Sequence, residues 1–226
     1  MNFGKLRLLL WVLVALGSGF LIVQRLLPTA PQSAQIAQPG TSLPIADPYV
    51  TLLDSTAQPF DTASLKSGHQ LVYFGFTFCP DVCPISARKM VVAEALYKKA
   101  ALGMPTLTTP ATSLFITIDP ERDSPEIMGF YAENLIEDVL DDFSEAERTA
   151  VKPDLIGLSG NRTQIDAAIA TYLVYADKVV EGSAPDDYRF NHSDLIYWVR
   201  PNGAVQFFSP RQSAQDIADA MIAASS

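Results

Sequence analysis

The chain has 226 residues, of which 25 are acidic and 16 are basic, so its net charge is −9. This length allows one domain of ordinary size together with additional segments. No stretch resembles the basic stripe of a nucleic-acid-binding protein, and the charge argues against nucleic acid as a partner. The same acidity is compatible with simple solubility and with attraction of a partner domain.

The N-terminus has the pattern of a membrane anchor. Residues 1–7 carry Lys5 and Arg7 and are expected to form a cytoplasmic N-terminus, whereas residues 8–27 are almost entirely apolar. This transmembrane stretch is about long enough to span a bilayer, with Arg25 reaching outward. A cleaved signal peptide is the alternative, but we find no good A-x-A site. Because positive charge precedes the span, the domain is predicted to face the periplasm, or the mitochondrial intermembrane space in a eukaryote.

A linker is predicted between this anchor and the folded domain. Residues 28–44 are uncharged and rich in Pro, Ala, Gln and Ser, with no apolar run that could join a core. A segment of this composition and length reaches roughly 20–50 Å. It would let a domain of residues 45–226 face other proteins on the same membrane.

Beyond the linker, strand-like and helix-like segments alternate. Apolar, β-prone runs predict strands at residues 49–53, 70–74, 113–118, 155–158, 174–180, 195–199 and 204–208. Helical spacing predicts helices at residues 85–101, from 124 through about 135, within 137–152, around 165–173, and from 213 through about 223. Ser124 is the predicted N-cap of the second of these helices, and Ser144 and Glu147 form a capping-box signature in the third. Residues 181–191 are expected to form a loop. This is an α/β plan with helices on both faces of a sheet, in the thioredoxin-like order.

The two cysteines of the chain lie where the strand at 70–74 is followed by the helix at 85–101. Cys79 and Cys83 have three residues between them. If this segment curls into a helical turn, the i,i+4 spacing puts both sulfurs on one side. The unpaired N–H groups and the dipole at a helix start favour thiolates. Such a pair could close a disulfide or hold a soft cation such as Cu(I).

Three other interpretations of the cysteine pair agree less well with the sequence. A structural disulfide across so short a loop would remove little chain entropy and would stabilise the fold poorly. The spacing is also one residue wider than that of thioredoxin-type redox sites, which suits a metal better than fast disulfide exchange. Zinc would accept two cysteines and a histidine, but a fourth ligand is not evident.

Three motifs, in order, resemble the Sco/SenC family: F-G-F-T-F-C-P-D-V-C-P, then I-T-I-D-P-E-R-D, then D-Y-R-F-N-H-S followed by an I-Y-W-V strand and P-N-G. The resemblance covers roughly residues 50–223. It implies a membrane-tethered, thioredoxin-like copper protein that serves assembly of the binuclear copper site, CuA, of cytochrome c oxidase. It also implies that Cys79, Cys83 and His192 are the copper ligands. The acidic stretch 137–152 is longer than the usual family connection, which affects the expected partner surface rather than the metal site.

The chemistry of His192 agrees with this implication. In a thioredoxin-type fold, the loop entering the back hairpin faces the cysteine motif, and this chain offers His192 there. Two thiolates and one imidazole suit copper, as Cu(I) or Cu(II). The other histidine, His69, lies in a polar turn and is expected on the surface.

The acidic motif after the strand at 113–118 is a second candidate feature. Asp119 and Asp123 follow the carboxyl end of that strand, where α/β folds place functional loops. Either aspartate could hydrogen-bond to a metal ligand without binding the metal itself, or could orient His192. Ordinary turn and capping chemistry is the alternative.

We therefore predict a copper metallochaperone rather than an enzyme. It would take copper from an upstream donor and deliver it to the CuA site of cytochrome c oxidase subunit II. The enzymatic alternative is a thiol–disulfide reductase that uses Cys79 and Cys83 as a redox-active disulfide to keep target cysteines reduced. A peroxiredoxin-like peroxidase is the weakest alternative, because the Thr-x-x-Cys setting is absent: Thr77 is one residue too close to Cys79.

Overall fold

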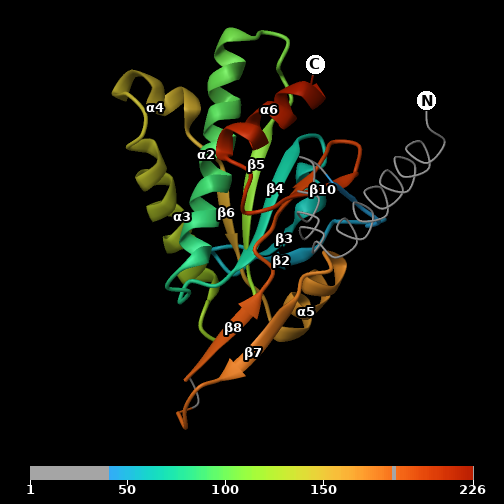
Figure 1. Cartoon of the computed structure of the whole chain (residues 1–226), viewed down its shortest axis with the longest axis vertical. Coiled ribbons are helices and arrows are strands. Elements are labelled where there is room, and N and C mark those ends of the chain that lie inside the picture. Colours follow the sequence, from blue (N-terminus) through green and yellow to red (C-terminus); the bar gives the residue numbers. More distant parts are fainter. Residues whose placement is uncertain (1–40, 185–186, 226) are drawn as a thin grey trace, which may run out of the picture. The chain divides into compact units, whose positions relative to one another are not determined.

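A six-stranded sheet forms the centre of the part of the chain that the structure describes, residues 41–184 and 187–225 of a computed structural model (Figure 1). Its strand order is β1-β10-β9-β4-β5-β6. The strands β4, β5 and β6 run parallel, whereas β9 is antiparallel to β4. The six strands are β1 (Thr41–Leu43), β4 (His69–Gly75), β5 (Ala111–Thr117), β6 (Leu155–Leu158), β9 (Ile196–Val199) and β10 (Val205–Phe208). The mixed sheet confirms the predicted α/β class.

The strand that leads to the cysteines lies in the middle of this sheet. All seven residues of β4 are buried. The apolar run Leu71–Phe74 predicts this burial, whereas His69 and Gln70 at the start of the strand are polar. On one face Tyr73 stacks on Phe115 of β5, with ring centroids 5.8 Å apart. On the other face Phe74 contacts Tyr172 and Tyr197. Aromatic packing on both faces therefore fixes the end of the strand from which the cysteine loop leaves.

The helices cover both faces of the sheet. They are α2 (Val82–Gly103), α3 (Pro125–Leu140), α4 (Glu145–Val151), α5 (Arg162–Thr171) and α6 (Ala214–Ser225), with a short 3-10 helix, η1 (Thr62–Leu65). α2 packs against α6, α3 and α4 (Figure 1). α3 approaches β6 closely because Gly157 has no side chain: a Cβ there would lie 2.2 Å from the carbonyl oxygen of Met128. On the opposite face, α5 leads into Tyr172, which packs on the sheet.

Two small sheets lie outside the main one. β2 (Thr51–Leu53) pairs with β3 (Pro59–Asp61), and β7 (Ala176–Val180) pairs with β8 (Tyr188–His192). In Figure 1 the β7–β8 hairpin extends beyond the end of the main sheet. This hairpin corrects the prediction of a loop at 181–191, because β8 begins at Tyr188. β8 forms because it pairs with β7, and local sequence composition does not predict that pairing.

The beginning of the domain also differs from the prediction. Thr41–Leu43 forms β1 and pairs with β10, so the sheet starts inside the segment that was predicted as linker, before Ile45. The edge of β10 offers unpaired backbone groups, and a short neighbouring segment satisfies them whatever its composition. The predicted anchor, residues 8–27, and most of the linker lie outside the described residues. Across 41–184 and 187–225, no helix combines the length and apolarity needed to cross a membrane.

Candidate metal centre

The two cysteines lie at the start of α2, as the sequence predicts. Cys83 is in the first turn of the helix and has no exposed surface. Cys79 lies in the preceding loop, is half-buried, and donates its backbone N–H to the carbonyl of Phe76 at 3.3 Å. Both are free thiols. Cys83 is thus held by the helix and the core, whereas Cys79 is partly exposed as a residue.

His192 is the last residue of β8 and meets the cysteines from the other side. Its Nε2 lies 3.2 Å from the Sγ of Cys83, and its Nδ1 lies 3.0 Å from the carbonyl oxygen of Ser193. A carbonyl only accepts, so Nδ1 carries the ring hydrogen and Nε2 keeps its lone pair. The ring is further positioned by edge contacts with Tyr73 and Phe76. This tautomer is the one that a metal ligand needs.

The structure brings the three candidate ligand atoms together. The two Sγ atoms and an imidazole nitrogen of Cys79, Cys83 and His192 all lie within 4.8 Å of one another. Metal–sulfur and metal–nitrogen bonds of roughly 2.0–2.3 Å place two ligand atoms up to about 4.6 Å apart across one ion. A single ion could therefore contact all three after small side-chain adjustments.

Burial dominates the protonation of this group. It raises the pKa of Cys83 above its ordinary value, and the neighbouring Cys79 adds to the effect. The expectation that the helix start favours a thiolate is therefore wrong for Cys83, because desolvation of a fully buried sulfur outweighs the dipole. Burial likewise lowers the pKa of His192. The metal-free group is a buried thiol beside a neutral imidazole, so binding a cation must release the proton of Cys83.

Asp123 fastens the cysteine loop to the sheet. This buried carboxylate accepts the backbone N–H of Thr77 at 3.0 Å and the hydroxyl of Thr117 at 2.7 Å. Thr77 stands two residues before Cys79. Asp123 thus acts on the sulfur through the backbone of the loop, and it is the carbonyl of Ser193 that orients His192.

Asp119 acts on the other side of the centre, through Tyr188 of β8. The carboxylate of Asp119 accepts the hydroxyl of Tyr188 at 2.8 Å and pairs with Arg122. The guanidinium of Arg122 lies 3.8 Å from the centre of the Tyr188 ring and donates to the Tyr188 carbonyl at 3.1 Å. We call these three residues the Tyr188 clamp. It holds the strand that carries His192 against the loop after β5.

Two further residues that the sequence did not single out border the centre. The hydroxyl of Tyr73 donates to Asp194 at 3.0 Å and lies beside the thiol of Cys83. Tyr73 sits inside an apolar strand, where a tyrosine passes for ordinary core. Asp194 follows His192 by two residues, and its position after the third motif was the one available signal.

The sequence model of the SCO1/SenC family matches residues 39–225 of this chain. An SCO2-like protein of Rickettsia prowazekii is 27% identical over 203 residues, which cover 89% of this chain and 87% of the relative. Human mitochondrial SCO2 homologue is 34% identical over 172 residues, covering 75% of this chain and 56% of the relative.

Solved structures agree with these sequence matches. ScoI of Arabidopsis thaliana, solved with copper bound, superposes with a TM-score of 0.61 at 25% identity, covering 78% of this chain and 95% of that one. ScoI of Bradyrhizobium japonicum, also with copper bound, has a TM-score of 0.56 at 29% identity, covering 77% of this chain and 96% of that one.

Proposed function

The chain belongs to the SCO1/SenC family, and from this premise we propose that it is a copper metallochaperone in which Cys79, Cys83 and His192 hold the ion. The observation that carries the proposal is the meeting of these three ligand atoms within 4.8 Å, from two segments more than a hundred residues apart. Two relatives of similar fold were solved with copper bound, which supports copper as the cargo.

The composition of the group favours copper over other cations. Two thiolates suit the soft Cu(I) ion, which accepts low coordination numbers, and an imidazole extends the set to one that Cu(II) tolerates. A structural zinc site needs four ligands, and the group found within the described residues has three. Cys79 is the more exposed of the two cysteine residues, so an incoming ligand of a partner would replace Cys79 at the metal before it replaces Cys83.

The recipient that we propose is the CuA site of cytochrome c oxidase subunit II, loaded by ligand exchange after an upstream donor has supplied the copper. Residues 8–27 would anchor the protein in the membrane and place the domain in the periplasm, or in the intermembrane space of a mitochondrion. Both proposals rest on the sequence pattern and on the family.

A thiol–disulfide reductase is the second candidate, and one observation favours it. The two cysteines are free, close together and differently exposed, so Cys79 could attack a target disulfide and Cys83 could then displace the target, leaving the protein oxidised and the target reduced. Burial and a raised pKa make Cys83 a slow second nucleophile. A metal site needs His192, whereas this exchange does not.

The test is a copper titration of the full-length protein in detergent micelles, in its reduced and its oxidised form, against a competing Cu(I) chelator. We expect one Cu(I) per reduced chain and none per oxidised chain, because a disulfide offers no thiolates. Stoichiometric Cu(I) on the oxidised protein would contradict the proposed site. A reduced protein that binds no Cu(I) but reduces a disulfide substrate would establish the thiol–disulfide reductase instead.

A further inference from the structure

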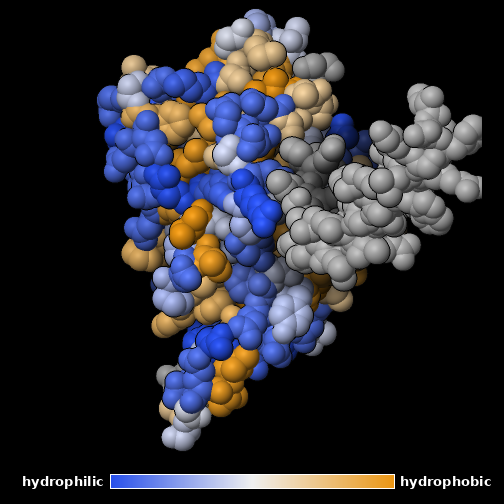
Figure 2. Space-filling model, in the orientation of Figure 1, coloured by the Kyte–Doolittle hydropathy of each residue, from blue (hydrophilic) through white to orange (hydrophobic). Residues whose placement is uncertain are grey.

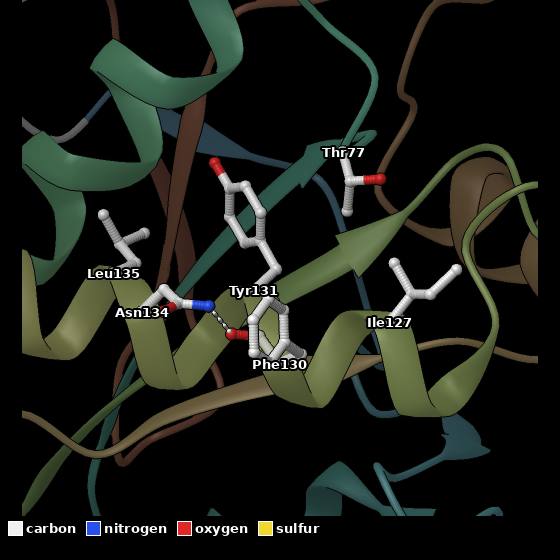
Figure 3. A pocket seen from close by; sticks show the side chains of 6 residues that line it. All are labelled: Thr77, Ile127, Phe130, Tyr131, Asn134 and Leu135. Carbon is white, nitrogen blue, oxygen red and sulfur yellow. Dashed lines mark hydrogen bonds between the residues drawn. The ribbon is translucent and has the colours of Figure 1, made fainter.

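An apolar hollow of about 360 Å³ lies between the cysteine loop and α3. Its lining is drawn in Figure 3: one residue from the loop after β4 and five from α3, namely Thr77, Ile127, Phe130, Tyr131, Asn134 and Leu135. We call it the α3 hollow. The amide of Asn134 donates to the backbone carbonyl of Phe130 at 2.7 Å, so this polar side chain is occupied with its own helix. The remaining lining is mainly apolar.

The side chains around the α3 hollow are unusually exposed for their type. Of the residues that line it, Phe130 is 69% exposed and Ile127 is 40% exposed. Phe78 and Ile85, which flank the cysteines in the sequence and are not part of the lining, are 61% and 62% exposed. Figure 2 shows hydrophobic side chains reaching the surface among hydrophilic ones over α2 and α3. Large apolar side chains exposed at the rim of an apolar hollow indicate a surface that another molecule covers.

A second hollow, of about 470 Å³, shares Ile127 and Phe130 with the first but is acidic. Glu126 and Glu133 line it, and neither takes part in an ion pair among the described residues. Asp138 in the last turn of α3 and Asp142 just beyond the helix differ, because Arg88 pairs with both. The acidic charge beside the α3 hollow is therefore available to a cationic partner.

The shape of the second hollow depends on the absence of a side chain at Gly129. An added Cβ there would lie 2.4 Å from the Cβ of Ser55, in the turn between β2 and β3. The glycine lets α3 approach this turn, and the turn forms one wall of the hollow. The ridge of Ile127 and Phe130 thus stands between an apolar and an acidic depression.

We propose that these two hollows are the docking surface for the copper-accepting protein, which places an apolar side chain in the α3 hollow and a nearby Lys or Arg in the acidic one. This inference rests on the proposed function. Charge complementarity selects a basic segment, and a net charge of −9 strengthens the attraction. Thr77 both lines the α3 hollow and precedes Cys79 by two residues, so a partner seated there has its metal ligands beside the more exposed cysteine.

The experiment measures association of the metal-free, full-length protein with the metal-free soluble copper domain of subunit II from the same organism. Phe130→Ser should weaken binding about tenfold or more, as loss of an anchoring aromatic residue does. Its matched control is Leu102→Ser, a residue 61% exposed in the last turn of α2. Glu133→Gln should weaken binding less and flatten its salt dependence, whereas Asp219→Asn on α6 should leave both unchanged.

Copper affinity is measured separately on each variant and should stay within about twofold of the parent, because none of these residues is a ligand. Equal binding by Phe130→Ser and Leu102→Ser would overturn the docking surface. A self-association that Phe130→Ser abolishes, with binding to the copper domain unchanged, would also overturn it and identify a second copy as the occupant. Failure of the parent to bind copper would defeat the proposed function, while the metal-free association would still decide the docking surface.

Discussion

The two sides of the metal centre are built in different ways. The sulfur side lies on the core: β4 is buried throughout between β5 and β9, and Cys83 has no exposed surface. The imidazole side lies on the β7–β8 hairpin, which shares no ladder with the six-stranded sheet among the described strands. The sulfur pair is therefore fixed by the fold itself, whereas His192 is placed by side-chain contacts of a separate hairpin.

This difference assigns separate roles to the ligands in the proposed transfer. Side-chain contacts, not strand pairing, hold this hairpin to the domain: the Tyr188 clamp and the packing of Phe190 on Phe76. An element held in this way can open locally without disrupting the main sheet. We infer that the sulfurs form the constant part of the site and that the imidazole is the adjustable part. The predictions below test this division, beginning with the largest expected effect.

Replacement of Cys83 by serine should disrupt the sulfur pair, the constant part of the site. We expect Cu(I) affinity to fall at least about a thousandfold, because a hydroxyl is a hard, protonated group that Cu(I) binds poorly. Serine is nearly isosteric, so the melting temperature should move by only a few degrees. A competition titration with a Cu(I) chelator measures the affinity. Ser86→Ala, a buried substitution one turn further along α2, is the control; tight Cu(I) binding by a folded Cys83→Ser protein would refute the assignment.

Replacement of His192 by alanine should separate the two copper ions. The two thiolates still hold Cu(I), so its affinity should fall less than about tenfold. Cu(II) prefers more ligands and takes nitrogen readily, so its affinity should fall about a hundredfold and the thiolate-to-copper absorption band should disappear. Visible spectroscopy during copper titration provides the measurement. Asn191→Ala, the preceding and exposed residue of β8, should keep the band; an unchanged spectrum in His192→Ala would exclude His192 as a ligand.

Loosening the Tyr188 clamp should reproduce part of that effect from a distance. Arg122→Met removes the guanidinium that pairs with Asp119 and contacts the Tyr188 ring and carbonyl. We expect roughly a tenfold loss of Cu(II) affinity, about 1.4 kcal/mol, with Cu(I) affinity nearly unchanged. Arg122→Lys should restore part of the loss, because a cation remains.

Arg189→Met is the matched control for the clamp. Arg189 lies on the same strand but pairs with Glu181 on the exposed side of the hairpin. If both methionine variants changed Cu(II) affinity equally, general loosening of the hairpin, rather than the Tyr188 clamp, would explain the result.

The same division explains what the sequence could predict. The strand before Cys79, the helix after Cys83 and the N-cap at Ser124 follow from local patterns of burial and capping, and the structure confirms them. The capping box at Ser144 and Glu147 is confirmed as well. Each of these features depends on residues close together in the chain, whose side-chain spacing can be read directly.

The features that failed depend on distant pairing. β8 forms because β7 lies beside it, and β1 forms because β10 offers an edge; neither partner is visible in the local composition. The meeting of His192 with the cysteines, which the structure bears out, was implied by a family resemblance and not by spacing. The Tyr188 clamp joins Asp119, in the loop after β5, to β8, which was predicted as a loop. Without that strand, the sequence gives Asp119 no partner beyond its own turn.

His69 is the clearest failure, since it was expected on the surface and is 1% exposed. Its Nδ1 accepts the indole N–H of Trp198 at 3.1 Å, so its Nε2 carries the hydrogen and donates to Ser225 at 2.6 Å. Tyr97 of α2 packs its ring edge against the imidazole, and the positive charge of Arg200 faces it. Both ring nitrogens of this histidine are bound by side chains outside the metal centre, whereas the Nε2 of His192 faces the sulfur of Cys83.

This buried network predicts the smallest effect, a pH dependence of stability. Burial, reinforced by Arg200, lowers the pKa of His69 to about 4. Below pH 6.5 His69 is protonated in the unfolded chain but stays neutral in the folded chain. The free energy of unfolding therefore falls as the pH drops from about 6.5 to 4 and levels off below that. Between pH 7 and 5.5 this titration lowers the free energy of unfolding by about 1 kcal/mol.

Urea unfolding of the copper-free protein measures this loss against His69→Gln, whose other titrating groups are the same. The variant should be less stable at pH 7 but should lose about 1 kcal/mol less over that interval; parallel curves would show that His69 titrates normally and is not held neutral by Trp198.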